Sequence, residues 1–199
     1  MSSYDKIQYA MWLLPVAFVV LTFLINRFEY RKNKNLKWGR AVVLSGFIFY
    51  LVVLYFLVIF PLSSQDQLQQ IYYANSPKAN LDFFRMFEAF YFGNPIFHGG
   101  NVLQMVFHVT FYEPLFNIVM TIPFGVFLRG YFKFSVLKTI FFGLLLSLFF
   151  ETSQLTGLWG IFDHSYRLFD VDDIFNNVLG VTIGALIFPL VDKILSKRV

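Results

Sequence analysis

The chain has 199 residues, of which 57% are apolar and only 14% are charged, with a net charge of +4 and a mean hydropathy of +0.61. A soluble domain carries about 25% charged residues, so this chain has too few charges to cover a surface in water. It contains 28 phenylalanines and no cysteine, which excludes disulfides, zinc–thiolate sites and cysteine nucleophiles. The composition predicts an integral membrane protein, for which we expect no nucleic-acid partner.

The N-terminal region, residues 1–62, contains two long apolar runs joined by a basic loop. A helix needs about 20 apolar residues to cross the hydrocarbon core of a bilayer, and residues 8–26 and 41–62 both satisfy this. The first run ends in basic residues and lacks a small-residue cleavage site, so we interpret it as a retained span rather than a signal peptide.

Residues 63–113 form a long connection between the second and third predicted spans. Its segment 81–92 is crowded with aromatic residues and also carries Asp82, Arg85 and Glu88. This pattern predicts an extracytoplasmic interfacial helix, with the aromatic side chains among lipid headgroups and the charges facing water. A buried helix of a small outer domain is the alternative.

The C-terminal region, residues 114–199, contains three further predicted spans at 115–128, 135–155 and 175–195. The first is short, although the weakly polar run from residue 102 can extend it, and Pro114 and Pro123 make it the least regular. The predicted fold is therefore an all-α integral membrane protein, a bundle of five transmembrane helices with an interfacial helix between spans 2 and 3.

Basic residues gather on one predicted side of the membrane, in the loops after spans 1 and 3 and in the C-terminal tail. They are Arg27, Arg31, Lys32, Lys34, Lys37, Arg40, Arg129, Lys133, Lys138, Lys193, Lys197 and Arg198. Only Glu29 and Asp192 oppose them on that side. Because short loops rich in Lys and Arg stay cytoplasmic, we predict a multi-pass bacterial cell-membrane protein with its N-terminus outside and its C-terminus inside.

Polar residues inside the last three spans all fall toward their predicted outer ends. Ser147, Glu151 and Gln154 are spaced by four and three residues and therefore share one helix face. A charge at the bilayer centre costs about 3 kcal/mol or more, so that face is expected to meet protein or water. Gly180 and Gly184, also spaced by four, are predicted to pack closely against another helix.

These positions predict a polar pocket near the outer leaflet. We expect it to be formed by Asn117, Glu151, Gln154, Arg167, Asp170, Asp173 and Asn176. No residue is assigned a catalytic role.

Structural explanations for the same residues remain open. Glu151 could pair with Arg167 or Arg85, and Asp172 or Asp173 could cap the last span. Asp170, Asp172 and Asp173 could hold a hard cation, although three acids in a loop are weak evidence, and His98, His108 and His164 are scattered. We predict no metal and no cofactor.

The arrangement of several polar residues and glycines in this sequence resembles that of the VanZ-like family, whose namesake is a teicoplanin resistance protein. The resemblance covers roughly residues 80–190, and the sequence pieces that carry it are spread over this region. They are Asn80-Leu81 with Phe83, Asn117 before Pro123-Phe124-Gly125, Ser147 with Glu151 and Gln154, then Arg167, Asp170-Val171-Asp172-Asp173, Asn176, Gly180 and Gly184. The loop 156–166 looks longer than in the family.

This resemblance implies a bacterial membrane protein and, for some members, reduced susceptibility to teicoplanin and lipoglycopeptides. Our first hypothesis is a non-enzymatic protein that binds or shields the antibiotic, or a lipid-linked cell-wall precursor, at the outer leaflet. Aromatic residues of 81–92 would then hold an acyl chain. The alternatives are an enzyme that modifies a lipid-linked wall precursor or a surface glycopolymer, with Glu151 or Asp173 as acid or base, and a small oligomeric transporter or flippase.

Overall fold

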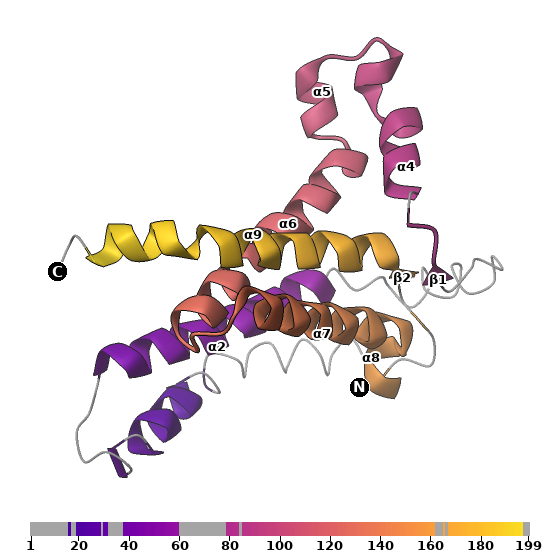
Figure 1. Cartoon of the computed structure of the whole chain (residues 1–199). Helices are drawn as coiled ribbons and strands as arrows, with labels where there is room; N and C mark the ends of the chain where they lie inside the picture. Colours follow the sequence, from indigo (N-terminus) through magenta and orange to yellow (C-terminus); the bar gives the residue numbers. More distant parts are fainter. Residues whose placement is uncertain are drawn as a thin grey trace. The chain divides into compact units, whose positions relative to one another are not determined.

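The computed structural model describes residues 16, 19–28, 30, 31, 38–59, 79–83, 85–161, 165 and 167–196. Most of these residues are helical, and the chain divides into two compact units, Met1–Gln67 and Leu68–Val199 (Figure 1). The two units are described separately below.

The first unit contains one helix long enough to cross a membrane. This helix, α2 (Trp38–Ile59), has 22 residues, and its segment Gly39–Ile59 is strongly apolar. It matches the predicted span 41–62, of which residues 60–62 lie outside the described chain. Val19–Phe28 forms a shorter apolar helix, while residues 8–15, 17 and 18 of the predicted first span are not described. A fifth span therefore stays a prediction.

The second unit supplies three more helices of membrane-spanning length, α6 (Val109–Gly130), α7 (Val136–Leu155) and α9 (Val171–Ser196). Helix α6 runs without interruption past Pro114 and Pro123. The expected extension from residue 102 is only partly right, because residues 109–114 belong to α6 whereas residues 102–106 form a separate short helix, α5 (Val102–Val106). The break follows from the extended backbone of His108, at φ −81° and ψ 141°, which starts α6 anew.

The core of the second unit lies where α6 and α7 pack on α9. Asn117 of α6 contacts Asp173, and Thr121 contacts Asn177, so α6 and α9 run in the same direction. Helix α7 runs antiparallel to α9, with Ser147 bonded to Asn177, and lies alongside it in Figure 1.

Glycines allow α6 and α9 to approach very closely. A Cβ added at Gly180 would collide with the carbonyl of Ile118, and one at Gly184 would collide with the carbonyl of Ile122. Gly125 of α6 makes the reciprocal approach to the backbone of α9. The two glycines predicted to pack thus lie at the crossing of α6 and α9.

A helical arm formed by α4 (Arg85–Gly93), η1 (Pro95–His98) and α5 precedes α6 and extends away from α9 (Figure 1). Asn94 lies between α4 and η1 and connects this part of the arm to the start of α6. This side chain is fully buried, accepts a hydrogen bond from the Ile96 amide and donates one to the Thr110 hydroxyl, each at 3.2 Å. Helix α4 overlaps the predicted helix 81–92 and buries none of its residues, which favours a surface helix over the buried alternative.

A two-stranded parallel sheet joins the start of the arm to the start of α9. Strand β1 (Ala79–Asn80) pairs with β2 (Phe169–Asp170), with Asn80 opposite Asp170. The short helix α8 (Gly157–Gly160) follows α7. Because β1 pairs with β2, residues about 90 positions apart meet at one end of the helices.

Candidate polar site at one end of the helices

Asp170 is the centre of a hydrogen-bond network at the N-terminal end of α9. Its Oδ1 accepts from the Asn80 amide and from the Asp172 backbone N–H, both at 2.9 Å. Its own backbone N–H donates to Oε2 of Glu151 at 2.8 Å. One residue thus connects β1, α7 and α9, and Asp170 caps α9 by satisfying a free N–H of its first turn.

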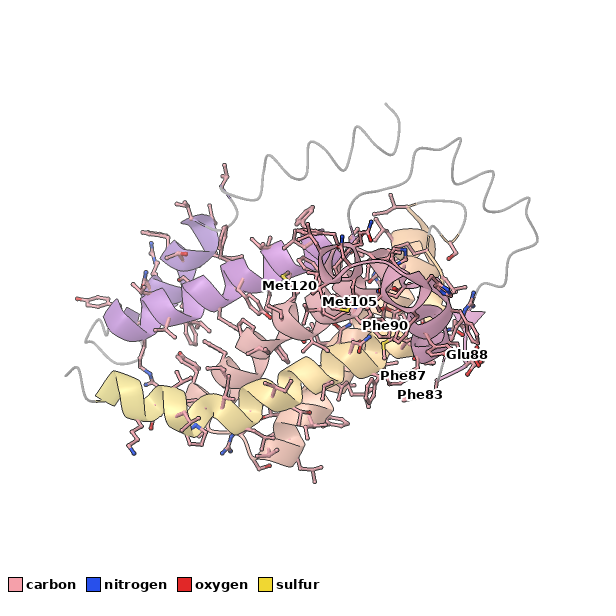
Figure 2. All side chains as sticks on the ribbon, turned by 90° about the horizontal axis from the view of Figure 1, so that it is seen from above. Phe83, Phe87, Glu88, Phe90, Met105 and Met120 are labelled. Atoms are coloured by element: carbon pink, nitrogen blue, oxygen red, sulfur yellow. The ribbon has the colours of Figure 1, made fainter. Side chains whose placement is uncertain are left out.

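Asp172 fixes α4 to the same end of α9. Its Oδ2 accepts from the Met86 backbone N–H at 2.9 Å, which satisfies one of the free N–H groups in the first turn of α4. Asn176 approaches the Met86 sulfur at 3.2 Å. In Figure 2 the labelled residues Phe83, just before α4, and Phe87 and Glu88 of α4 accordingly lie by the N-terminal end of α9.

Deeper in the unit, polar pairs connect α9 to both neighbouring helices. Asn117 donates to Oδ1 of Asp173 at 2.7 Å, and Asn177 donates to the Ser147 hydroxyl at 3.0 Å. The Thr121 hydroxyl donates to the Asn177 carbonyl at 2.9 Å. These pairs satisfy polar groups that would be costly to leave unpaired in an apolar environment.

Glu151 and Gln154 are almost completely buried, each with 1% of its surface exposed. Arg167, by contrast, is exposed. Its guanidinium interacts electrostatically with Glu151 and Asp173. The structural explanation that Glu151 pairs with Arg167 or Arg85 stays a prediction.

A cavity of about 180 Å³ opens beside this network, between α4, α6 and the start of α9. Its lining includes both acidic and apolar residues. The acidic residues are Glu113, Asp170, Asp172 and Asp173, and the apolar residues are Met86, Ala89, Val109 and Pro114. Arg85 is the cation in the lining.

The structure divides the predicted site residues into three groups. Asp170, Asp173 and Asn176 line the cavity. Asn117 and Glu151 hold cavity residues in place through the hydrogen bonds above, whereas Gln154 and Arg167 are not part of the lining.

Sequence reasoning left Asp172 and the α4 residues Arg85 and Met86 out of the predicted site. Asp172 had a signal, since it belongs to the acidic run, but it was interpreted as a possible helix cap. Arg85 and Met86 had none, because their position depends on the pairing of β1 with β2. Within the described chain, no group of three or more acidic or histidine side chains is arranged to hold a metal ion. His164 lies outside the described residues.

Apolar helices of spanning length, with polar side chains converging at one end of three of them, define a multi-pass α-helical membrane protein. The chain belongs to the VanZ/LLP1 family, whose model matches residues 47–192. The match extends from within α2 almost to the end of α9 and includes the whole cavity. No curated protein and no solved structure gives a significant match to the chain.

Proposed function

We propose that this protein lowers susceptibility to teicoplanin and related lipoglycopeptides without catalysis, by binding or shielding the drug or a lipid-linked cell-wall precursor at the outer leaflet. Membership of the VanZ/LLP1 family supports the link to resistance. The observation that carries the binding role is the partly acidic, partly apolar cavity at the end of the spanning helices.

Charge distribution within the second unit supports an extracytoplasmic cavity. Arg129, Lys133, Lys138 and Lys193 lie at or near the ends of α6, α7 and α9 that are remote from the cavity. Basic residues at membrane boundaries stay on the cytoplasmic side, so the acidic end would face outward. Lipoglycopeptides and completed lipid-linked precursors meet the membrane on that side.

The size of the cavity favours recognition of a headgroup-sized part of the ligand. Pockets for drug-sized molecules measure roughly 300–1,000 Å³, whereas this cavity measures about 180 Å³. A complete glycopeptide would therefore remain outside while a smaller polar group enters. Exposed aromatic residues of the arm, such as Phe87, Tyr91 and Phe92, would contact an acyl chain in the interfacial region.

An isosteric substitution in the cavity tests this role. Asp173→Asn removes a carboxylate from the lining while keeping an oxygen that can accept from Asn117. We expect bacteria expressing the variant at wild-type level to lose their reduced susceptibility to teicoplanin. Glu88→Gln is the matched control, because Glu88 is an exposed carboxylate of α4 outside the cavity lining.

Direct binding in detergent then identifies the ligand. Purified protein would be titrated with teicoplanin, with an analogue lacking the lipid tail, and with a lipid-linked precursor. Binding to one of them that is weakened by Asp173→Asn supports the proposal. Unchanged resistance together with no binding to drug or precursor would refute it.

Asp173 also keeps the enzymatic alternative open, because it lines the cavity, whereas Glu151 does not. A general acid or base must come within hydrogen-bond reach of its substrate, so Asp173 is the better candidate of the two. An altered mass profile of wall precursors on expression, lost with Asp173→Asn, would favour catalysis. An unchanged profile would favour binding alone.

A further inference from the structure

Asp172, a residue of the cavity lining, has one buried carboxylate oxygen without a partner among the described residues. Asp172 is only 6% exposed, and its Oδ2 is occupied by the Met86 backbone N–H. No group in the described part of the chain forms a hydrogen bond with its Oδ1. A buried carboxylate oxygen without a donor is energetically unfavourable, so a ligand that supplies a donor at this point would be stabilised.

The charge of the lining indicates which kind of donor fits. Asp172 shares the cavity with the carboxylates of Glu113, Asp170 and Asp173, and Arg85 is the cation among the lining residues. A cationic donor would reduce the repulsion among these carboxylates and would also form charge-assisted hydrogen bonds, which are stronger than neutral ones.

An ammonium group suits the cavity better than a metal ion. Hard metal ions such as Ca²⁺ require six to eight converging oxygen ligands, and the described residues contain no suitable group of acidic or histidine side chains. The Oδ1 atoms of Asp170 and Asp173 already accept hydrogen bonds within the protein. An ammonium has only three hydrogens to donate, so Asp172 Oδ1 and one or two neighbours suffice.

The apolar residues of the lining indicate what the ammonium group is attached to. Met86 and Ala89 of α4 and Val109 and Pro114 of α6 line the cavity together with the carboxylates. Carbon atoms next to an ammonium group would bury apolar surface against these side chains. The ligand is therefore an amphiphile, with a charged end and a hydrocarbon part.

We propose that the cavity binds the primary ammonium group of an amphiphile, with Oδ1 of Asp172 as its principal acceptor. Two sources share this chemistry, an amine without phosphate and a phospholipid with an aminoethyl headgroup. In the second case Arg85, also in the lining, would interact with the phosphate. The inference narrows the ligand chemistry of the proposed function and rests on that function only for the cellular role.

The first test uses the full chain in a non-ionic detergent, titrated with octylamine in a calorimeter. Octyltrimethylammonium and octanol are the comparison probes, because the former has the charge without N–H donors and the latter has no charge. We expect octylamine to bind at least about tenfold more tightly than either probe, since hydrogen bonds to charged groups contribute that much. Equal affinities for all three would overturn the proposal.

The second test changes the acceptor. Asp172→Asn keeps an oxygen for the Met86 N–H but presents an amide donor to the cavity, so octylamine affinity should fall by about tenfold or more. Glu113→Gln, at an exposed position of the lining, should cause a smaller loss. If Asp172→Asn does not fold, a loss of octylamine affinity in Glu113→Gln supports the proposal, and an unchanged affinity contradicts it. Glu88→Gln should leave the affinity unchanged, and an equal loss in this control would contradict the proposal.

The third test separates the two sources. Short-chain phosphatidylethanolamine should bind more tightly than the matching phosphatidylcholine, and Arg85→Gln should weaken the phospholipid but not octylamine. Binding of octylamine with no preference between the phospholipids would support the ammonium site and assign it to an amine without phosphate. Octylamine binding without any effect on teicoplanin susceptibility would refute the proposed function only, and resistance without amine binding would refute only this inference.

Discussion

Glu151 illustrates how a carboxylate in a membrane-spanning helix can be satisfied by backbone. It is 1% exposed, accepts from the Asp170 amide at 2.8 Å and interacts electrostatically with Arg167. The hydrogen bond fixes the segment that carries both Asp170 and Asp172. Glu151 therefore positions the cavity wall from behind, and its substitution should be felt first as a change in stability.

Removing this acceptor is predicted to destabilise the protein. Glu151→Ala would leave the Asp170 N–H unpaired and create a void, lowering the free energy of unfolding by about 2–4 kcal/mol. Glu151→Gln retains an oxygen at the same position and should cost less than half as much. Thermal unfolding in detergent measures both. Thr152→Ala, whose hydroxyl bonds only within α7, should change stability by about 0.5 kcal/mol or less; equal losses in all three variants would contradict this role.

At the same scale, the sequence indicated which residues gather but not which oxygen each one engages. The placement of Glu151 and Gln154 on one face followed from helical periodicity. The position of Asp173 near Asn117 followed from the predicted topology, which puts both at the outer end of the spans. The bond from Met86 to Asp172 could not be predicted, because it joins residues 86 positions apart through an unforeseen sheet pairing. This is why Asp172, now the principal residue of the proposed ammonium site, was interpreted as a possible cap.

Among the helices, the crossing of α6 and α9 determines where the site forms. The two helices run in the same direction with partners 56 positions apart, as in the contacts of Asn117 with Asp173 and of Thr121 with Asn177. Gly180 and Gly184 permit this close approach. The polar side chains of α6 and α9 therefore lie within hydrogen-bonding distance of the other helix. The packing of the spans and the polar site are thus one arrangement.

Adding a single methyl group at this crossing is predicted to separate the helices. Gly184→Ala places a Cβ against the carbonyl of Ile122, which should cost about 2 kcal/mol or more through overpacking and should also weaken ligand binding. Gly46→Ala in α2 is the control, because nothing lies within 4 Å of its added Cβ. The control should be neutral or slightly stabilising. Equal thermal stability of the two variants would refute the close-packing argument.

The spans themselves could be predicted from length and hydropathy, since α2, α6, α7 and α9 all correspond to predicted runs. The start of α9 could not, because Val171, Asp172 and Asp173 read as a polar loop. They are helical because Asp170 caps the helix and a charged first turn suits its N-terminus. Helix α4 was predicted within the segment 81–92, but its continuation through η1 into the separate helix α5 was not, since the turn after α4 depends on the buried Asn94.

On the scale of the whole molecule, the distribution of charge predicts which way the chain crosses the membrane. Within the second unit, the carboxylates of the cavity lie at one end of α6, α7 and α9, and Arg129, Lys138 and Lys193 lie toward the other. The helices offer no other strong signal of direction, because their middles are apolar. Cysteine labelling can test the orientation directly, since the chain contains no cysteine of its own.

Single cysteines at the two ends are expected to differ in their reaction with a membrane-impermeant maleimide. Glu88→Cys, at the cavity end, should be labelled in intact cells. Asp192→Cys, at the basic end, should react only after the cells are permeabilised, and this substitution strengthens the basic bias of that end. The reverse pattern would overturn both the orientation and the outer-leaflet function that depends on it.

Ser3→Cys extends the experiment to the number of crossings, because five spans place the N-terminus opposite the C-terminus and four place both on the same side. Labelling of Ser3→Cys in intact cells, together with protection of Asp192→Cys, is the result that five spans predict.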